Sequence, residues 1–87
     1  MNNEEWNAHN GLLQQAYRAY LHAVKQKEKD EACMKIQREL EWPPFEDLCF
    51  ENSAPISGIS RYGLDSVSEK CIDIINKIAK GEVKKRY

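Results

Sequence analysis

The sequence has no long hydrophobic run and little glycine, and both shortages exclude functions. No apolar stretch approaches the roughly 20 residues that span a bilayer, so we expect no membrane-spanning helix. The chain starts Met1-Asn2-Asn3-Glu4-Glu5, which is polar and acidic where a signal peptide is basic and then apolar. The four glycines form neither a phosphate-binding loop nor a nucleophile elbow. We therefore expect a protein that is not an enzyme and that acts through binding.

Soft metal ligands are few and badly spaced. The three cysteines, Cys33, Cys49 and Cys71, lie far apart in sequence, and neither a C-x-x-C nor an H-x-x-x-H pair is present. We therefore expect no metal and no other cofactor. An odd number of cysteines without an export signal favours reduced thiols and a cytoplasmic location. His9 and His22 lie thirteen residues apart on one predicted helix, where both are expected to be ordinary surface residues.

A basic excess is also missing. The formal net charge is -1 at pH 7, so the usual electrostatic footprint of a nucleic-acid-binding protein is absent. Hydrophobic residues make up 41% and charged residues 31% of the chain, values typical of a folded domain. The length of 87 residues leaves room for one helical domain with a small core. Such a core gains stability from a partner or from a second copy.

What is present is helical periodicity. The first apolar series has alternating spacings of four and three, which predict one helix face: Trp6, Asn10, Leu13, Tyr17, Tyr20 and Val24. We expect this helix over about 4–27, with Asn3 as its N-cap and Gly11 inside it; the alternative is a shorter helix capped by Asn10. Asn10 either fixes the register of a buried seam or lies in solvent near a weak helix end. The neighbouring Gly11 favours the second interpretation.

The polar stretch that follows allows two arrangements. The next apolar set, Cys33, Ile36 and Leu40, lies about 160° away from the first on a helical wheel with 100° per residue. Either the chain turns near residues 28–30, or one long helix packs on opposite sides at its two ends. We favour the turn, with Asp30 as the N-cap of a second helix over about 31–41.

The remainder alternates between breakers and helices. Two prolines at 43 and 44 end the second helix, and the apolar spacing after them predicts a short helix over about 44–50. We expect the rest of 42–65 to be irregular, with Ile56, Ile59 and Tyr62 pinning it to the core. Ser66 and Glu69 match a capping box for a helix over about 66–80, followed by a basic tail at 81–87. The fold class is therefore all-α: a small three-helix bundle with a short extra helical turn before the C-terminal helix.

A five-residue stretch, Gly63-Leu64-Asp65-Ser66-Val67, resembles the G-x-D-S-[LIV] attachment motif of acyl and peptidyl carrier proteins. In that family the serine carries a phosphopantetheine arm and opens a helix. A carrier domain has several helices after this serine, whereas only 21 residues follow Ser66. The capping box accounts for the same residues physically, so the sequence is not assigned to that family.

Acidic residues gather in one part of the chain. Residues 39–60 hold five acids and no Lys or Arg, while the rest of the chain holds nine acids and thirteen bases. Three aromatic residues lie in the same stretch. Apolar anchors ringed by charge are typical of protein interfaces, so we predict a partner-binding segment. Its residues are Glu39, Glu41, Trp42, Phe45, Glu46, Asp47, Phe50 and Glu51. In the alternative, the aromatic side chains complete the core and the acids only solvate the surface.

Three functions follow from this pattern. The first is a small protein-binding module, an inhibitor, antitoxin-like or immunity-type protein that occludes the basic surface of another protein. The second is a helical structural or adaptor subunit that associates with itself. The small core favours it, and so do two a/d seams, the one in the first helix and a second one formed by Val67, Cys71, Ile74 and Ile78. The third is a small nucleic-acid-binding protein that uses the basic tail, Lys84-Lys85-Arg86.

Overall fold

A computed structural model describes residues 3–66 and 69–80, and over these residues the chain is helical without any strand. This confirms the all-α class. The elements are α1 (Asn3–His22), α2 (Gln26–Leu40), α3 (Pro43–Glu51), α4 (Ile59–Tyr62), a 3₁₀ turn η1 (Leu64–Ser66) and α5 (Glu69–Ala79). The N- and C-terminal ends and residues 67–68 lie outside this description, so the predicted basic tail does too.

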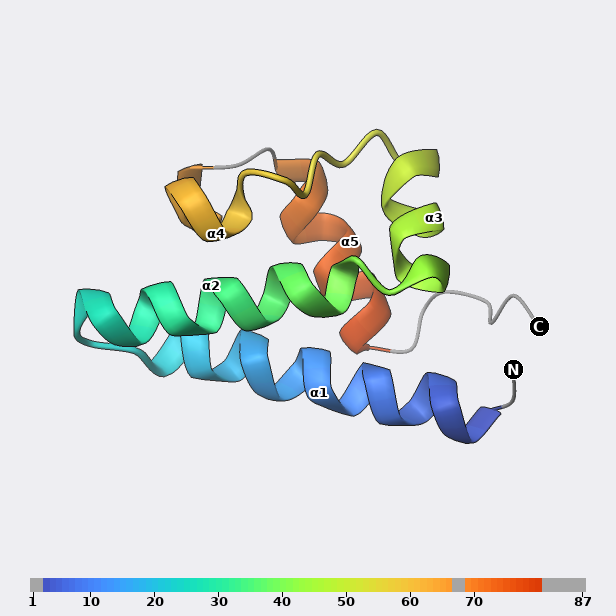
Figure 1. The fold of residues 1–87 in the computed structure, drawn as a ribbon, viewed down its shortest axis with the longest axis horizontal. Coiled ribbons are helices and arrows are strands. Elements are labelled where there is room, and N and C mark those ends of the chain that lie inside the picture. The colour runs from blue at the N-terminus through green and yellow to red at the C-terminus, as the bar shows by residue number, and fades with distance from the viewer. Residues whose placement is uncertain (1–2, 67–68, 81–87) are drawn as a thin grey trace.

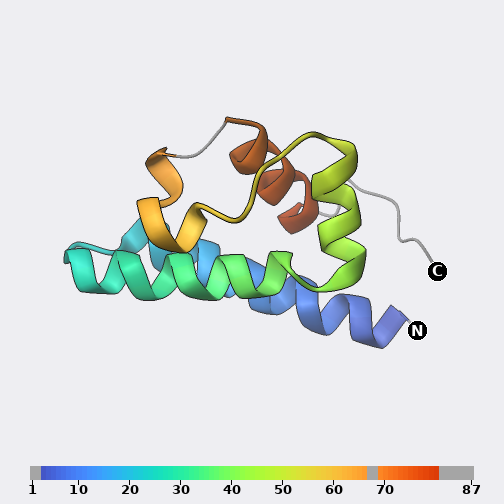
Figure 2. The same cartoon turned by 45° about the horizontal axis from the view of Figure 1, so that its top comes forward.

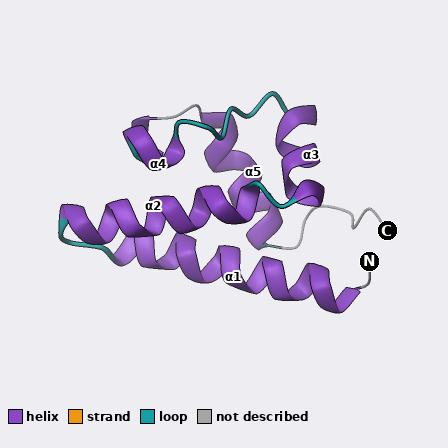
Figure 3. Ribbon diagram, in the orientation of Figure 1, coloured by secondary structure: helices purple, strands orange, loops and turns teal. Residues whose placement is uncertain are grey.

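The two longest helices, α1 and α2, form an antiparallel hairpin (Figure 1). Helices α3 and α4 pack on α2, while α5 packs on both α1 and α3. The shorter helices therefore cover one side of the hairpin (Figure 2). The longest loop between described helices runs from α3 to α4 across this side (Figure 3). The radius of gyration is 12.1 Å, which is the value of a compact chain of this length.

The hairpin turn lies earlier than the sequence predicted. The chain turns at residues 23–25, not at 28–30, so the first helix is shorter and the second longer than expected. Val24, which was placed in the seam, is 87% exposed. Lys25 precedes α2 in an extended conformation (φ -86°, ψ 146°), and Asp30 is inside the helix instead of capping it. The residues from 26 onward favour a helix but suit either α1 or α2, so the packing of the two helices against each other sets the place of the turn.

The predicted apolar faces form the core. On α2, Cys33, Ile36 and Leu40 are all buried, as the phase argument required. The other buried apolar side chains come from every helix, from η1 and from one loop position. They are Trp6, Leu13, Ala16, Tyr20, Ala32, Phe45, Leu48, Cys49, Ala54, Ile59, Leu64, Cys71, Ile74, Ile75 and Ile78. The favoured interpretation of Asn10, a solvent-exposed residue near a weak helix end, is wrong. Helix α1 is continuous around Asn10, and the Oδ1 atom of Asn10 is buried without a hydrogen-bond partner among the described residues.

The segment expected to be irregular contains a helix. The short helix predicted at 44–50 is confirmed as α3, but α4 and η1 follow within the same predicted loop. Gly58 and Gly63 flank α4, so these glycines delimit a single helical turn instead of preventing one. Ile59 is buried and Ile56 packs against the core as expected, whereas Tyr62 is 64% exposed and does not pin the loop. The capping box at Ser66 involves residues outside those described, and α5 is described from Glu69 onward.

Candidate functional site

Helix α3 presents most of the predicted binding segment, and both of its ends are well defined. Two prolines occupy its first two positions, where a missing N–H group costs no helical hydrogen bond. At the other end, Ser53 adopts a left-handed conformation with φ 55°. The Ser53 N–H donates to the Phe50 carbonyl, and the Ala54 N–H donates to the Cys49 carbonyl over 2.8 Å. These two bonds form a Schellman cap, which ends the helix directly after its acidic face.

Two of the three predicted aromatic anchors belong to the interior. Phe45 is fully buried, so it cannot contact a partner in this structure. Trp42 is half-buried and packs against the core. Their rings lie 5.0 Å apart, and each also meets Trp6 of α1, at 6.0 Å from Trp42 and 5.0 Å from Phe45. For Phe45 and Trp42 the core interpretation is therefore the correct one, and they fix α3 against the hairpin.

A histidine completes this aromatic cluster. The His9 ring stacks on Trp42 with a centroid distance of 3.9 Å, and its Nδ1 atom lies 2.7 Å from Glu39 Oε1. Both His9 and Glu39 are partly buried. The expectation that His9 is an ordinary surface residue is therefore wrong, and Glu39 is paired with a residue of its own chain, away from the acids of α3. Sequence reasoning missed this pair because its members lie 30 residues apart and meet only when the hairpin closes.

What remains on the surface is one acidic face with one apolar anchor. Phe50 is 85% exposed, the largest exposed fraction of any aromatic side chain in the described chain. Three exposed acids lie beside it on the same short helix. We call these four residues the α3 acidic face: Glu46, Asp47, Phe50 and Glu51. Glu41 is also exposed, on the connection that leads into α3. Only part of the predicted segment is therefore available to a partner.

One side of this face borders a basic neighbour. A shallow hollow of about 200 Å³ lies between the end of α3 and α5, lined by Asn52, Lys70, Asp73, Ile74 and Lys77. Lysines along one border and carboxylates on the face itself give this end of the molecule two adjoining charge regions.

The thiols of Cys49 in α3 and Cys71 in α5 are poor nucleophiles. Burial, with smaller contributions from the nearby Cys71 and Glu46, raises the pKa of Cys49 from 9.0 to about 12. Burial also raises the pKa of Cys71, whose Sγ donates to the Pro55 carbonyl over 2.6 Å. Thiols held in the neutral form attack electrophiles and bind metals weakly, because the thiolate is the reactive species. Cys33 is buried as well.

The described residues contain neither a metal site nor a membrane-spanning helix. Across 3–66 and 69–80, no group of three His, Cys, Asp or Glu side chains is arranged to hold a metal ion. No helix in these same ranges is long and apolar enough to cross a membrane. Comparison with protein-family models, with curated proteins and with solved structures finds no match to this chain. The α3 acidic face therefore has to be interpreted from its own chemistry.

Proposed function

We propose that this chain is a protein-binding module whose α3 acidic face covers a basic surface of another protein, in the manner of an inhibitor, antitoxin-like or immunity-type protein. The observation that carries the proposal is Phe50, a phenylalanine left 85% exposed beside three acids. A large aromatic side chain costs free energy when water surrounds it, and burying it in a partner recovers that cost. The acids attract a basic partner and accelerate its association.

The packing behind the face supports the same function. Trp42 and Phe45 anchor the start of α3 in the core, and the Schellman cap at Ser53 closes its end. The helix that carries Phe50 is thus held at both ends, so little conformational freedom would be lost when a partner binds. Rigid presentation of an aromatic anchor is a general property of tight protein interfaces.

The test begins with a tagged chain that isolates its partner from native cells, followed by binding kinetics with purified partner. We expect Asp47→Lys to slow association at low salt, and Phe50→Ala to accelerate dissociation at least roughly tenfold, as for other buried anchors. Two matched controls keep binding intact. Asp30→Lys makes the same charge change at the fifth residue of α2, and Tyr62→Ala removes another exposed aromatic ring.

The outcome that contradicts the proposal is equally specific. If Phe50→Ala and Asp47→Lys bind the partner as the wild-type chain does, the α3 acidic face is not the interface. Equal losses in the two control variants would show that the effect is not specific to α3.

A further inference from the structure

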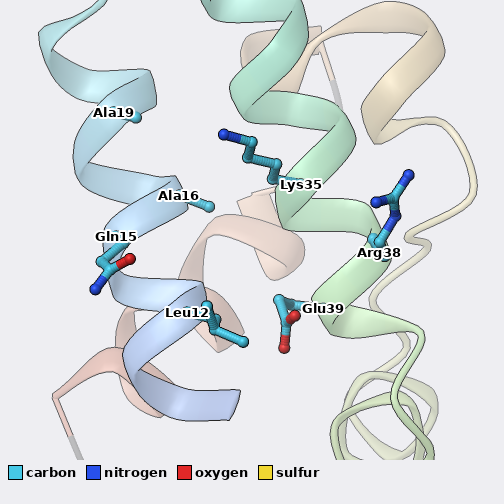
Figure 4. Close-up of a pocket in the computed structure, with 7 residues that line it drawn as sticks. All are labelled: Leu12, Gln15, Ala16, Ala19, Lys35, Arg38 and Glu39. Atoms are coloured by element: carbon cyan, nitrogen blue, oxygen red, sulfur yellow. The ribbon is translucent and has the colours of Figure 1, made fainter. Parts of the chain in front are cut away.

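The hairpin has an outer groove that the shorter helices do not cover. One part of it, about 270 Å³, is lined by Leu12, Gln15, Ala16, Ala19, Lys35, Arg38 and Glu39 (Figure 4). A second part of about 320 Å³ continues toward the turn and is lined by Ala19, His22, Ala23, Glu28, Glu31, Ala32 and Lys35. The two parts share Ala19 and Lys35, so they form one groove along the length of the hairpin.

Each helix contributes a different stripe to this groove. The α1 stripe is apolar and mostly small: Leu12, Ala16, Ala19 and Ala23. The α2 stripe is charged and exposed: Glu28, Glu31, Lys35 and Arg38. The charged stripe has spacings of three, four and three, so it follows one helix face. None of its four side chains forms an ion pair with another described residue. At about 1.5 Å per residue, both stripes are roughly 15 Å long.

The charge order on α2 is self-complementary. The acids lie at the N-terminal end of the stripe and the cations at its C-terminal end. If a second α2 is laid antiparallel with residue 33 as the common midpoint, residue 28 faces residue 38 and residue 31 faces residue 35. Arg38 then meets Glu28 of the second copy, and Lys35 meets its Glu31, with both pairs formed twice. Opposite charges at such distances attract, whereas a parallel arrangement would place like charges together.

The apolar stripe has the same symmetry at the same level. A midpoint between residues 17 and 18 places Leu12 against Ala23 and Ala16 against Ala19 of a second α1. Within one hairpin, Ala16 and Ala19 of α1 lie opposite Lys35 of α2, and His9 of α1 lies opposite Glu39 of α2. Residue 33 of α2 therefore lies at about the level of residues 17 and 18 of α1. One two-fold axis satisfies both stripes.

We propose that the outer groove binds a second copy of this chain, so that two hairpins form an antiparallel four-helix bundle. Each helix would have antiparallel neighbours, and the alanines of the α1 stripe would let the two α1 helices approach closely. The interface is isologous, because the same surface serves both copies. Its apolar part is small and its ion pairs are exposed at the rim, so the dimer is weak and loosens as salt increases.

Charge reversal tests the register directly. In Lys35→Glu/Arg38→Glu the stripe is entirely acidic, and in Glu28→Lys/Glu31→Lys it is entirely basic. Light scattering and sedimentation at low salt should show a dimer for the wild-type chain and a monomer for each variant alone. An equimolar mixture of the two variants should form a one-to-one heterodimer, because every facing pair again has opposite signs. Far-ultraviolet circular dichroism reports whether each variant keeps its helices.

A matched control reverses two cations outside the groove, Arg18→Glu/Lys27→Glu, and should remain dimeric. Ala19→Glu, at an exposed position in the apolar stripe, should separate the copies without any change on α2. Three outcomes would overturn the proposal: a wild-type monomer at millimolar concentration and low salt, variants that remain dimeric alone, or a mixture that stays monomeric. A wild-type monomer would show that the outer groove does not bind a second copy of this chain.

Discussion

Two glycines have opposite requirements on the backbone. Gly11 lies within α1, and a Cβ atom added there would meet no atom within 4 Å. A Cβ atom at Gly63 would also meet no atom, but Gly63 has a φ of 86°, a backbone angle that residues with a side chain rarely adopt. We expect Gly11→Ala to raise the free energy of unfolding by about 0.5–1 kcal/mol. Gly63→Ala should lower it by about 1–3 kcal/mol, because the backbone conformation is strained for alanine. Urea unfolding measures both, and equal signs for the two variants would contradict this account.

The buried thiol of Cys49 gives the protein a stability limit at alkaline pH. Its pKa rises from 9.0 to about 12 in the folded state, chiefly through burial, so the unfolded chain loses this proton first as pH increases. The stabilising contribution is complete below pH 9 and is lost as pH rises toward 12. We expect the free energy of unfolding to fall between pH 9 and pH 11, and Cys49→Ala to show a smaller fall. A thiol reagent at pH 8 should modify the unfolded chain much faster than the folded one.

At the scale of single elements, α3 ends on an energetically costly residue. Ser53 occupies the left-handed position of the Schellman cap, where glycine is the usual residue. The left-handed conformation costs a non-glycine residue roughly 1–2 kcal/mol, and replacing Ser53 with glycine removes this cost. Part of the stabilisation is lost again, because glycine has greater conformational freedom in the unfolded chain. We expect Ser53→Gly to stabilise the protein by about 0.5–1 kcal/mol in thermal or urea unfolding. A destabilised variant would show that the serine side chain has a role beyond the cap.

His9 contributes to the contact between α1 and the start of α3, beside Trp6. Its ring stacks on Trp42 and its Nδ1 atom hydrogen-bonds Glu39, so His9→Ala removes a ring contact and leaves a partly buried carboxylate unpaired. We expect a loss of about 1–3 kcal/mol in the free energy of unfolding. Tryptophan fluorescence should change as well, since His9 lies directly on the Trp42 ring. His22→Ala is the matched control, because His22 is exposed at the other end of α1, and no loss is expected there.

Periodicity predicted which faces are buried, but not where the chain turns. The apolar phases of α2 and α5 were read correctly because burial of Ile36 or Ile74 depends on helical spacing alone. The turn at 23–25 contains no glycine or proline, so only the packing of the two helices fixes its place. The aromatic segment shows the same limit: sequence placed Phe45 and Phe50 in one candidate site, and tertiary packing put the first in the core and left the second exposed.

The whole molecule carries its two proposed interfaces on separate residues. The α3 acidic face offers Phe50 and carboxylates, while the outer groove offers an alanine-lined floor and the mixed charges of α2. Neither surface contributes to the core that holds the shorter helices against the hairpin, apart from the buried Ala16 and Ala32. A substitution that breaks one contact should therefore leave the fold and the other contact intact.

This separation predicts the composition of the assembled complex. If each copy binds one basic partner through α3 while two copies pair through their hairpins, the complex contains two copies of each protein. Light scattering at low salt should give the mass of that two-to-two assembly, and Lys35→Glu/Arg38→Glu should reduce it to one-to-one without changing the affinity for the partner. Phe50→Ala should have the converse effect, because it weakens partner binding and leaves the dimer in place. If the wild-type chain alone is a dimer, a one-to-one complex would instead show that the partner and the second copy compete for the same surface.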